Sequence, residues 1–149
     1  MSTIKYYSTN NKSERGNFET ALMRGLASNY GLYMIAREDI PKLSPEAIAA
    51  MKGMPYAAIA FEVLAPFLLE EIGEVELRAI LDSAYDESII RTNVQHLTGK
   101  THILWLSGGP TYSFKDYAAR FFANTLDHFL AKSGKRRVVA VATSGDTGG

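Results

Sequence analysis

The run HILWLSGGPTYSFKDYAARFFANTLDHFLAKSGKRRVVAVATSGDTGG, residues 102–149, determines the fold class of this chain. It begins with a compact apolar segment at His102–Leu106, continues through a helical pattern after Ser113, and reaches a second apolar segment at Val138–Thr143. A strand, a helix and a strand at this spacing predict a βαβ unit with parallel strands. The second segment is rich in valine and alanine, as is typical of a strand buried on both faces. We therefore expect an α/β fold.

The helix of this unit has apolar residues at helical spacing, which predicts one buried face. Gly134 is expected to end it, and Lys132 favours the negative end of the helix dipole. The residues expected on the buried face are Phe114, Tyr117, Ala118, Phe121, Phe122, Leu126, Phe129 and Leu130.

Residues 1–98 have a different pattern and are expected to form a mainly helical N-terminal domain. Ile4–Ser8 predicts a short strand, with a loop from Thr9 to Gly16 and a further extended piece at Leu32–Met34. Asn17 and Ser44 are candidate helix caps, and Pro45 suits a first helical position. The helices are expected at about 17–28, 44–52, 55–69 with a kink or division at Pro66, and 74–85.

Residues 99–149 are expected to begin a second domain, of the α/β class. The second strand leads to the loop Ser144–Gly149, where a parallel sheet requires a further helix, and the sequence stops. Two parallel strands are a poor stopping point for an independent fold. We therefore expect an incomplete domain that continues in a missing C-terminal part.

Composition narrows the classes of function. The 149 residues suit about one ordinary domain, and 46% hydrophobic with 21% charged residues predicts a soluble globular protein. Sixteen basic residues balance sixteen acidic residues, so nucleic acid and anionic membranes are not expected partners. The polar N-terminus lacks a secretory signal, and no apolar run is long enough to span a bilayer. We expect a cytoplasmic protein.

No metal site is expected. The chain has no cysteine, which removes thiolate ligands, cysteine nucleophiles and disulfides together. Its histidines, His96, His102 and His128, lack the spacing of metal ligands.

The first candidate site is Ser113-Phe114-Lys115-Asp116, where a loop meets a helix. Ser113 and Asp116 fit a capping box, which would make Lys115 the second residue of the helix. The helix N-terminus already has a partial positive charge, so a lysine in a partly dry pocket there should have a lowered pKa. A neutral amine is what a Schiff-base lysine requires. The alternative interpretation of the same spacing is a solvated surface lysine.

The second candidate site is the loop Ser144–Gly149. Hydroxyls, backbone amides and glycines at the carboxyl end of a strand can hold an anion. The alternative is an ordinary turn between a strand and a helix. The loop lacks the lysine of the phosphate-binding nucleotide motif, which excludes an ATP site of that kind.

Five segments together resemble threonine synthase, over nearly the whole chain. They are Tyr6-Tyr7-Ser8-Thr9, Tyr30-Gly31-Leu32-Tyr33-Met34, Tyr56–Phe67, the run 109–116 (GPTYSFKD) and the run 141–148 (VATSGDTG). The Ser-Phe-Lys-Asp core resembles the wider fold-type II family of pyridoxal-phosphate enzymes, and the remaining motifs point to threonine synthase. Ser107-Gly108 departs from the histidine-containing version of this loop, which puts a substrate contact from it in doubt.

The resemblance implies a pyridoxal 5'-phosphate enzyme that converts O-phospho-L-homoserine and water to L-threonine and phosphate. It implies that Lys115 forms the Schiff base and moves protons. It also implies a cofactor site and a substrate site that share part of the second loop. The implied cofactor residues are Lys115, Phe114, Asp116, Ser144, Gly145, Asp146, Thr147 and Gly148, and the implied substrate residues are Thr143, Ser144 and Thr147. Asp146 stands where many fold-type II enzymes have asparagine, so its role stays open.

In members of the family, residues beyond the part that this chain matches bind the cofactor phosphate and the pyridine nitrogen. We therefore expect the chain alone to have little or no activity. Two alternatives remain open. One is another fold-type II enzyme, such as a dehydratase. The other is a non-catalytic threonine synthase-like fragment that acts through protein contacts.

Overall fold

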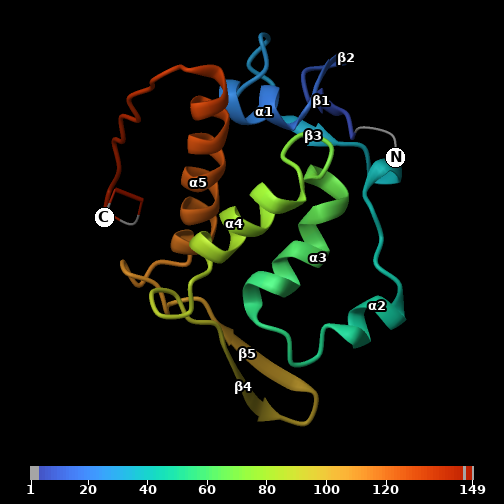
Figure 1. The fold of residues 1–149 in the computed structure, drawn as a ribbon, viewed down its shortest axis with the longest axis vertical. Helices are drawn as coiled ribbons and strands as arrows, with labels where there is room; N and C mark the ends of the chain where they lie inside the picture. Colours follow the sequence, from blue (N-terminus) through green and yellow to red (C-terminus); the bar gives the residue numbers. More distant parts are fainter. Residues whose placement is uncertain (1–3, 146, 149) are drawn as a thin grey trace. The chain divides into compact units, whose positions relative to one another are not determined.

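The computed structural model describes residues 4–145, 147 and 148, which form two compact units (Figure 1). Unit 1 consists of Met1–Met54 and Phe61–Leu77, and unit 2 consists of Pro55–Ala60 and Arg78–Gly149. The predicted boundary between residues 98 and 99 remains a prediction. Helices and two small antiparallel sheets occur together, and the expected α/β class is confirmed.

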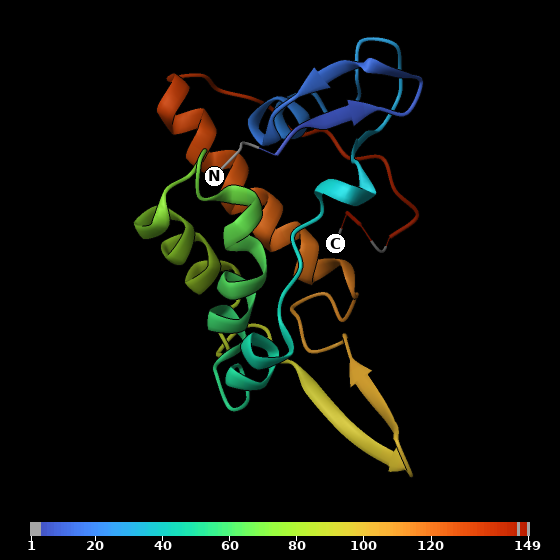
Figure 2. The same ribbon diagram turned by 90° about the vertical axis from the view of Figure 1, so that its right-hand side faces the viewer.

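Unit 1 begins with a three-stranded antiparallel sheet in the order β2-β1-β3 (Figure 2). Its strands are β1 (Tyr6–Ser8), β2 (Asn11–Gly16) and β3 (Tyr33–Ile35). The expected strand and the expected extended piece correspond to β1 and β3. The prediction of a loop at residues 9–16 was wrong, because residues 11–16 form the edge strand β2. Its residues are mostly exposed and polar, so they lack the alternation of apolar and polar side chains that indicates a strand.

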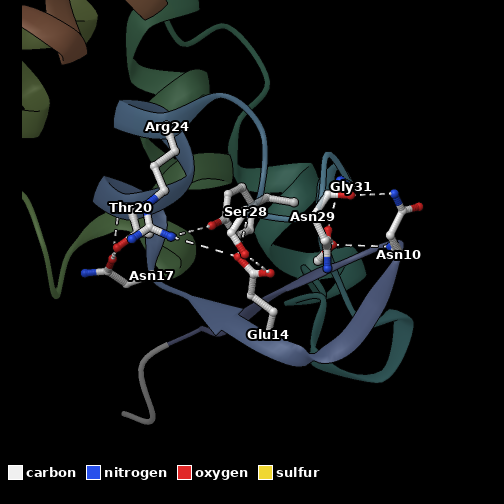
Figure 3. Close-up of polar contacts among 10 residues, drawn as sticks. Asn10, Glu14, Asn17, Thr20, Arg24, Ser28, Asn29 and Gly31 are labelled. Atoms are coloured by element: carbon white, nitrogen blue, oxygen red, sulfur yellow. Dashed lines mark hydrogen bonds and ion pairs between the residues drawn. The ribbon is translucent and has the colours of Figure 1, made fainter.

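Helix α1 (Phe18–Arg24) has the predicted cap, because Asn17 Oδ1 accepts the Thr20 amide at 3.0 Å (Figure 3). The carboxylate of Glu71 accepts the two preceding amides of the first turn, from Phe18 at 2.8 Å and Glu19 at 2.9 Å. The helix ends at Arg24, before the expected position, because Gly25 has φ 74° and its amide closes on the Ala21 carbonyl. Side-chain bonds therefore fix the start of α1, and a glycine ends it.

The turn between α1 and β3 is held by polar side chains (Figure 3). Asn29 Oδ1 accepts the hydroxyl of the fully buried Ser8 at 2.7 Å and the amide of Gly31 at 3.0 Å. Glu14 accepts the amide and the hydroxyl of Ser28 at 2.9 and 2.8 Å. These bonds lower the pKa of Glu14, the backbone bond most of all.

The middle of the chain is helical, as expected. A short 3₁₀ helix η1 (Arg37–Asp39) precedes α2 (Pro45–Ala50), where Ser44 Oγ accepts the Ala47 amide at 3.1 Å and confirms the predicted cap. Helices α3 (Tyr56–Leu68) and α4 (Glu74–Ala84) follow, and residues of each belong to both units. Pro66 does not divide α3, because it lies in the last turn and the helix ends two residues later. The core residues of unit 1 on and after these helices are Phe61, Ala65, Leu68, Ile72 and Leu77.

Unit 2 contains a β-hairpin where a buried parallel strand was expected. Strand β5 (Thr101–Trp105) pairs antiparallel with β4 (Asn93–Thr98), and Gly99 makes the turn with φ 55°. The prediction of β5 as a strand was correct, but its parallel pairing was wrong. Both strands are largely exposed. The sequence of β4 therefore needs no alternation of apolar and polar residues, and without that alternation β4 was not predicted as a strand.

Helix α5 (Lys115–Ser133) is the long helix that the sequence predicted, and Gly134 ends it in the left-handed conformation. It buries Asp116, Tyr117, Thr125, Leu126 and Phe129. Three residues that were expected on the buried face, Phe114, Ala118 and Phe122, are exposed. The buried stripe of α5 is thus narrower than its apolar stripe.

The expected second strand does not form. Residues 138–143 belong to no strand in the described part of the chain, and Val138 is 95% exposed. An extended segment becomes a strand only when a neighbour accepts and donates its backbone hydrogen bonds, and no described strand pairs with residues 138–143. The βαβ unit is therefore absent from the described residues.

Within the described residues, no helix is both long enough and apolar enough to cross a membrane.

Candidate functional site

The site centred on Lys115 lies at the first residue of α5, in unit 2. The preceding residue, Phe114, already has helical dihedral angles and makes no side-chain capping bond. Ser113 Oγ instead accepts the Lys115 amide at 3.3 Å. The predicted capping box was wrong, because the partner of Asp116 is Thr111.

Asp116 ties the loop to the helix. Its side chain is only 8% exposed, and its carboxylate accepts the Thr111 amide at 2.9 Å and the Thr111 hydroxyl at 2.7 Å. The role of Thr111 was not predicted from the sequence. The available signal was an acidic residue in the first turn of a helix, which can accept amides from the loop before it. We call this pair the Thr111–Asp116 clasp.

Two glycines let the backbone approach closely beside the clasp. A Cβ added to Gly109 would lie 2.7 Å from Asp116 Cβ, and a Cβ added to Gly108 would overlap the Arg91 carbonyl. The Arg91 amide donates to the Gly108 carbonyl at 3.1 Å, and the hydroxyl of Tyr117 donates to the Arg91 carbonyl at 2.5 Å. The loop before Lys115 is thus fixed at both ends, by α5 and by the segment before β4.

Lys115 is half-buried, and its ammonium lies 5.8 Å from the centroid of the Phe114 ring. This distance is within the range of a cation–π interaction. Phe114 is itself 63% exposed, so its ring offers a flat apolar surface beside the amine. An amine next to such a surface can bind a flat carbonyl compound covalently.

The second candidate loop forms a turn around Thr143. The Thr143 hydroxyl oxygen accepts the amides of Gly145 and Thr147 at 3.3 and 3.4 Å. Ser144 is exposed, and Gly148 packs so closely against Thr143 that a Cβ there would overlap its methyl group. Asp146 lies outside the described residues. Two of the loop amides therefore have a partner within the loop.

A groove of about 480 Å³ is lined by residues of α5 and of the segment that follows it. Phe122, Leu126, Val139 and Thr147 are among the residues that line it, and Lys115 is not among the described ones that do. The structure thus brings Thr111, Phe114, Lys115 and Asp116 together at the start of α5. Thr147 instead lines the groove beside the middle of α5, together with Phe122 and Leu126.

Among the described residues, no group of three or more histidine, aspartate or glutamate side chains could hold a metal ion.

Comparison with known proteins gives consistent matches. The family model described as "Threonine synthase N terminus" matches residues 5–85. Threonine synthase of Pseudomonas aeruginosa is 39% identical over 149 residues, which cover 97% of this chain and 31% of the relative. Threonine synthase-like 2 of Mus musculus is 38% identical, over 96% of this chain and 30% of the relative. The chain therefore spans about 30% of the length of these relatives.

Solved structures agree with the sequence matches. The PLP-bound threonine synthase of Brucella melitensis superposes with a TM-score of 0.81 and 32% identity, over 90% of this chain and 29% of that chain. The yeast threonine synthase has a TM-score of 0.75 and 30% identity, over 88% of this chain and 27% of that chain. Since the family model covers more than half of the residues and the structural match extends beyond it, this chain belongs to the threonine synthase N-terminal family.

Proposed function

We propose that this chain carries the lysine that binds pyridoxal 5'-phosphate in a threonine synthase. The reaction converts O-phospho-L-homoserine and water to L-threonine and phosphate, with loss of phosphate from Cγ and addition of water at Cβ. The observation that carries the proposal is the clasped loop that places Lys115 at the first residue of α5, in a chain that aligns over 97% of its length with a threonine synthase.

The residues around Lys115 suit this cofactor, which is a flat aromatic aldehyde with a phosphate. Lys115 provides an amine, and the exposed ring of Phe114 provides a flat apolar surface 5.8 Å from it. A similar structure, the threonine synthase of Brucella melitensis, is described as PLP-bound. In our proposal Phe114 and Asp116 flank the cofactor, and Ser144, Gly145, Asp146, Thr147 and Gly148 line it.

When bound, the cofactor supplies an electron sink that allows the substrate to lose protons at Cα and Cβ. Lys115 Nζ moves these protons, since an amine at the reacting centre can act as base and then as acid. Thr143, Ser144 and Thr147 receive the substrate carboxylate through hydroxyls and amides. Asp116 does not need to touch the substrate, because its carboxylate holds Thr111 and thereby the loop that precedes Lys115.

We also propose that these 149 residues alone bind the cofactor weakly and have little or no activity. The chain spans 31% of the Pseudomonas aeruginosa relative. The family resemblance implies that later residues bind the cofactor phosphate and the pyridine nitrogen. The remaining part of the enzyme is therefore the partner that this chain requires.

A hybrid enzyme tests the proposal. This chain would replace the aligned N-terminal part of the Pseudomonas aeruginosa threonine synthase, and phosphate release from O-phospho-L-homoserine would be measured. We expect turnover that Lys115→Ala abolishes and that Lys100→Ala, at an exposed lysine in the β4–β5 turn, preserves. A folded hybrid without turnover would contradict the proposal, as would an active Lys115→Ala variant. Turnover of serine or threonine instead would favour a dehydratase.

A further inference from the structure

Tyr112 has an unusual backbone conformation for a bulky residue. Its φ is 58°, in the left-handed region, where a Cβ crowds the backbone. Among the described residues, those with positive φ are six glycines and two tyrosines, Tyr30 and Tyr112. The chain thus places glycine at most such positions, and a tyrosine there requires a separate reason.

Packing does not compensate for this strain, because the side chain of Tyr112 is 81% exposed. The loop also leaves the residue little freedom. The Tyr112 amide donates to the Gly109 carbonyl at 3.1 Å, and its neighbour Thr111 is held by Asp116 at 2.9 and 2.7 Å. The fold therefore keeps a large ring in solvent at a strained position.

The position of Tyr112 in the sequence indicates which ligand its ring can contact. Tyr112 lies three residues before Lys115 and two before Phe114, whose exposed ring already lies beside the Lys115 ammonium. Two exposed rings from one anchored loop suit a flat conjugated ligand, since aromatic faces stack on such groups. We propose that the ring of Tyr112 contacts the pyridoxal phosphate bound at Lys115, an inference that rests on the function proposed above.

Reductive trapping measures this contact. The hybrid enzyme described above would be incubated with pyridoxal phosphate and then reduced with borohydride, and the adduct on each lysine would be quantified by peptide mapping. We expect Tyr112→Gly to lower the share of adduct on Lys115 by about two- to tenfold, the effect of losing one aromatic contact. Its thermal midpoint should stay the same or rise, because glycine relieves the left-handed strain. Tyr112→Phe keeps the ring and should retain the share of the unchanged hybrid.

Tyr30 offers a matched control. It has φ 63° and is 83% exposed, but it belongs to unit 1. Tyr30→Gly relieves the same strain and should leave the adduct on Lys115 unchanged. The inference is overturned if Tyr112→Gly leaves the share unchanged, or if Tyr30→Gly lowers it equally. Absence of any preference for Lys115 in the unchanged hybrid would instead refute the assignment of the cofactor to Lys115, and this inference with it.

Discussion

The Thr111–Asp116 clasp should be the strongest polar contact near Lys115, and its strength can be measured. The perturbation is Thr111→Val, which keeps the shape of the side chain and removes the hydroxyl that donates to Asp116 at 2.7 Å and accepts the Ser113 amide at 3.3 Å. Asp116 is only 8% exposed, so water does not readily replace the lost donor. The backbone bond from the Thr111 amide at 2.9 Å remains.

The magnitude follows from this geometry. A hydrogen bond to a charged group contributes about 1.5–3 kcal/mol, so Thr111→Val should lower the free energy of unfolding by about that amount. Asp116→Ala removes both bonds and leaves two donors without their acceptor, which should cost about 2–4 kcal/mol. Thr111→Ser keeps both bonds and should change stability by less than about 0.5 kcal/mol.

A double-mutant cycle separates the clasp from other effects. Equilibrium urea unfolding of the two single variants and of the double variant should give a coupling energy of about 1.5–3 kcal/mol between Thr111 and Asp116. A coupling energy near zero would refute the reasoning, because the two side chains would then contribute independently. A Thr111→Ser variant as unstable as Thr111→Val would also contradict it.

Three further predictions concern unit 2. Gly109→Ala should destabilise the chain by about 1–3 kcal/mol in urea, because the new Cβ would lie 2.7 Å from Asp116 Cβ, and an unchanged midpoint would contradict this. Arg120→Met should cost about 1–3 kcal/mol, since the guanidinium donates at 2.7 Å to each of two carbonyls at the end of α4. Arg120→Lys should recover only part of that loss, because an ammonium lacks the planar fork, and full recovery would argue against two bonds. Burial, and then the Tyr56 phenol, raises the pKa of Tyr85 to about 12. The folded chain therefore keeps a proton that the unfolded chain releases near pH 10, so stability falls as pH rises from about 10 to about 12. In thermal unfolding across this range, Tyr85→Phe should lose less stability than the unchanged chain, and an equal loss would count against this cause.

Local signals predicted most of the helices. Asn17 and Ser44 make the capping bonds that their residue types indicate, and Gly134 ends α5 where a glycine was expected. Such bonds join residues three to five apart, so the sequence contains both partners. The motif around Lys115 was found instead from the resemblance of residues 109–116 to a family motif, since the capping box predicted there was wrong.

Contacts between distant residues were not predictable in this way. The pairing of β5 depends on β4, which has no apolar alternation, and residues 138–143 match a strand pattern but have no neighbouring strand. Glu71 reaches the start of α1 from more than fifty residues away. The clasp was missed because the capping-box pattern suggested Ser113, whereas the carboxylate bonds to Thr111.

The central claim is that Lys115 binds the cofactor. The most direct measurement is to incubate the hybrid enzyme, which supplies the later residues, with pyridoxal phosphate, reduce it with borohydride, and map the pyridoxyl group to individual lysines. Our account predicts that the adduct is concentrated on Lys115, and that Lys115→Arg removes this peak without increasing the others. Labelling spread evenly over the exposed lysines, with no excess on Lys115, would contradict the account.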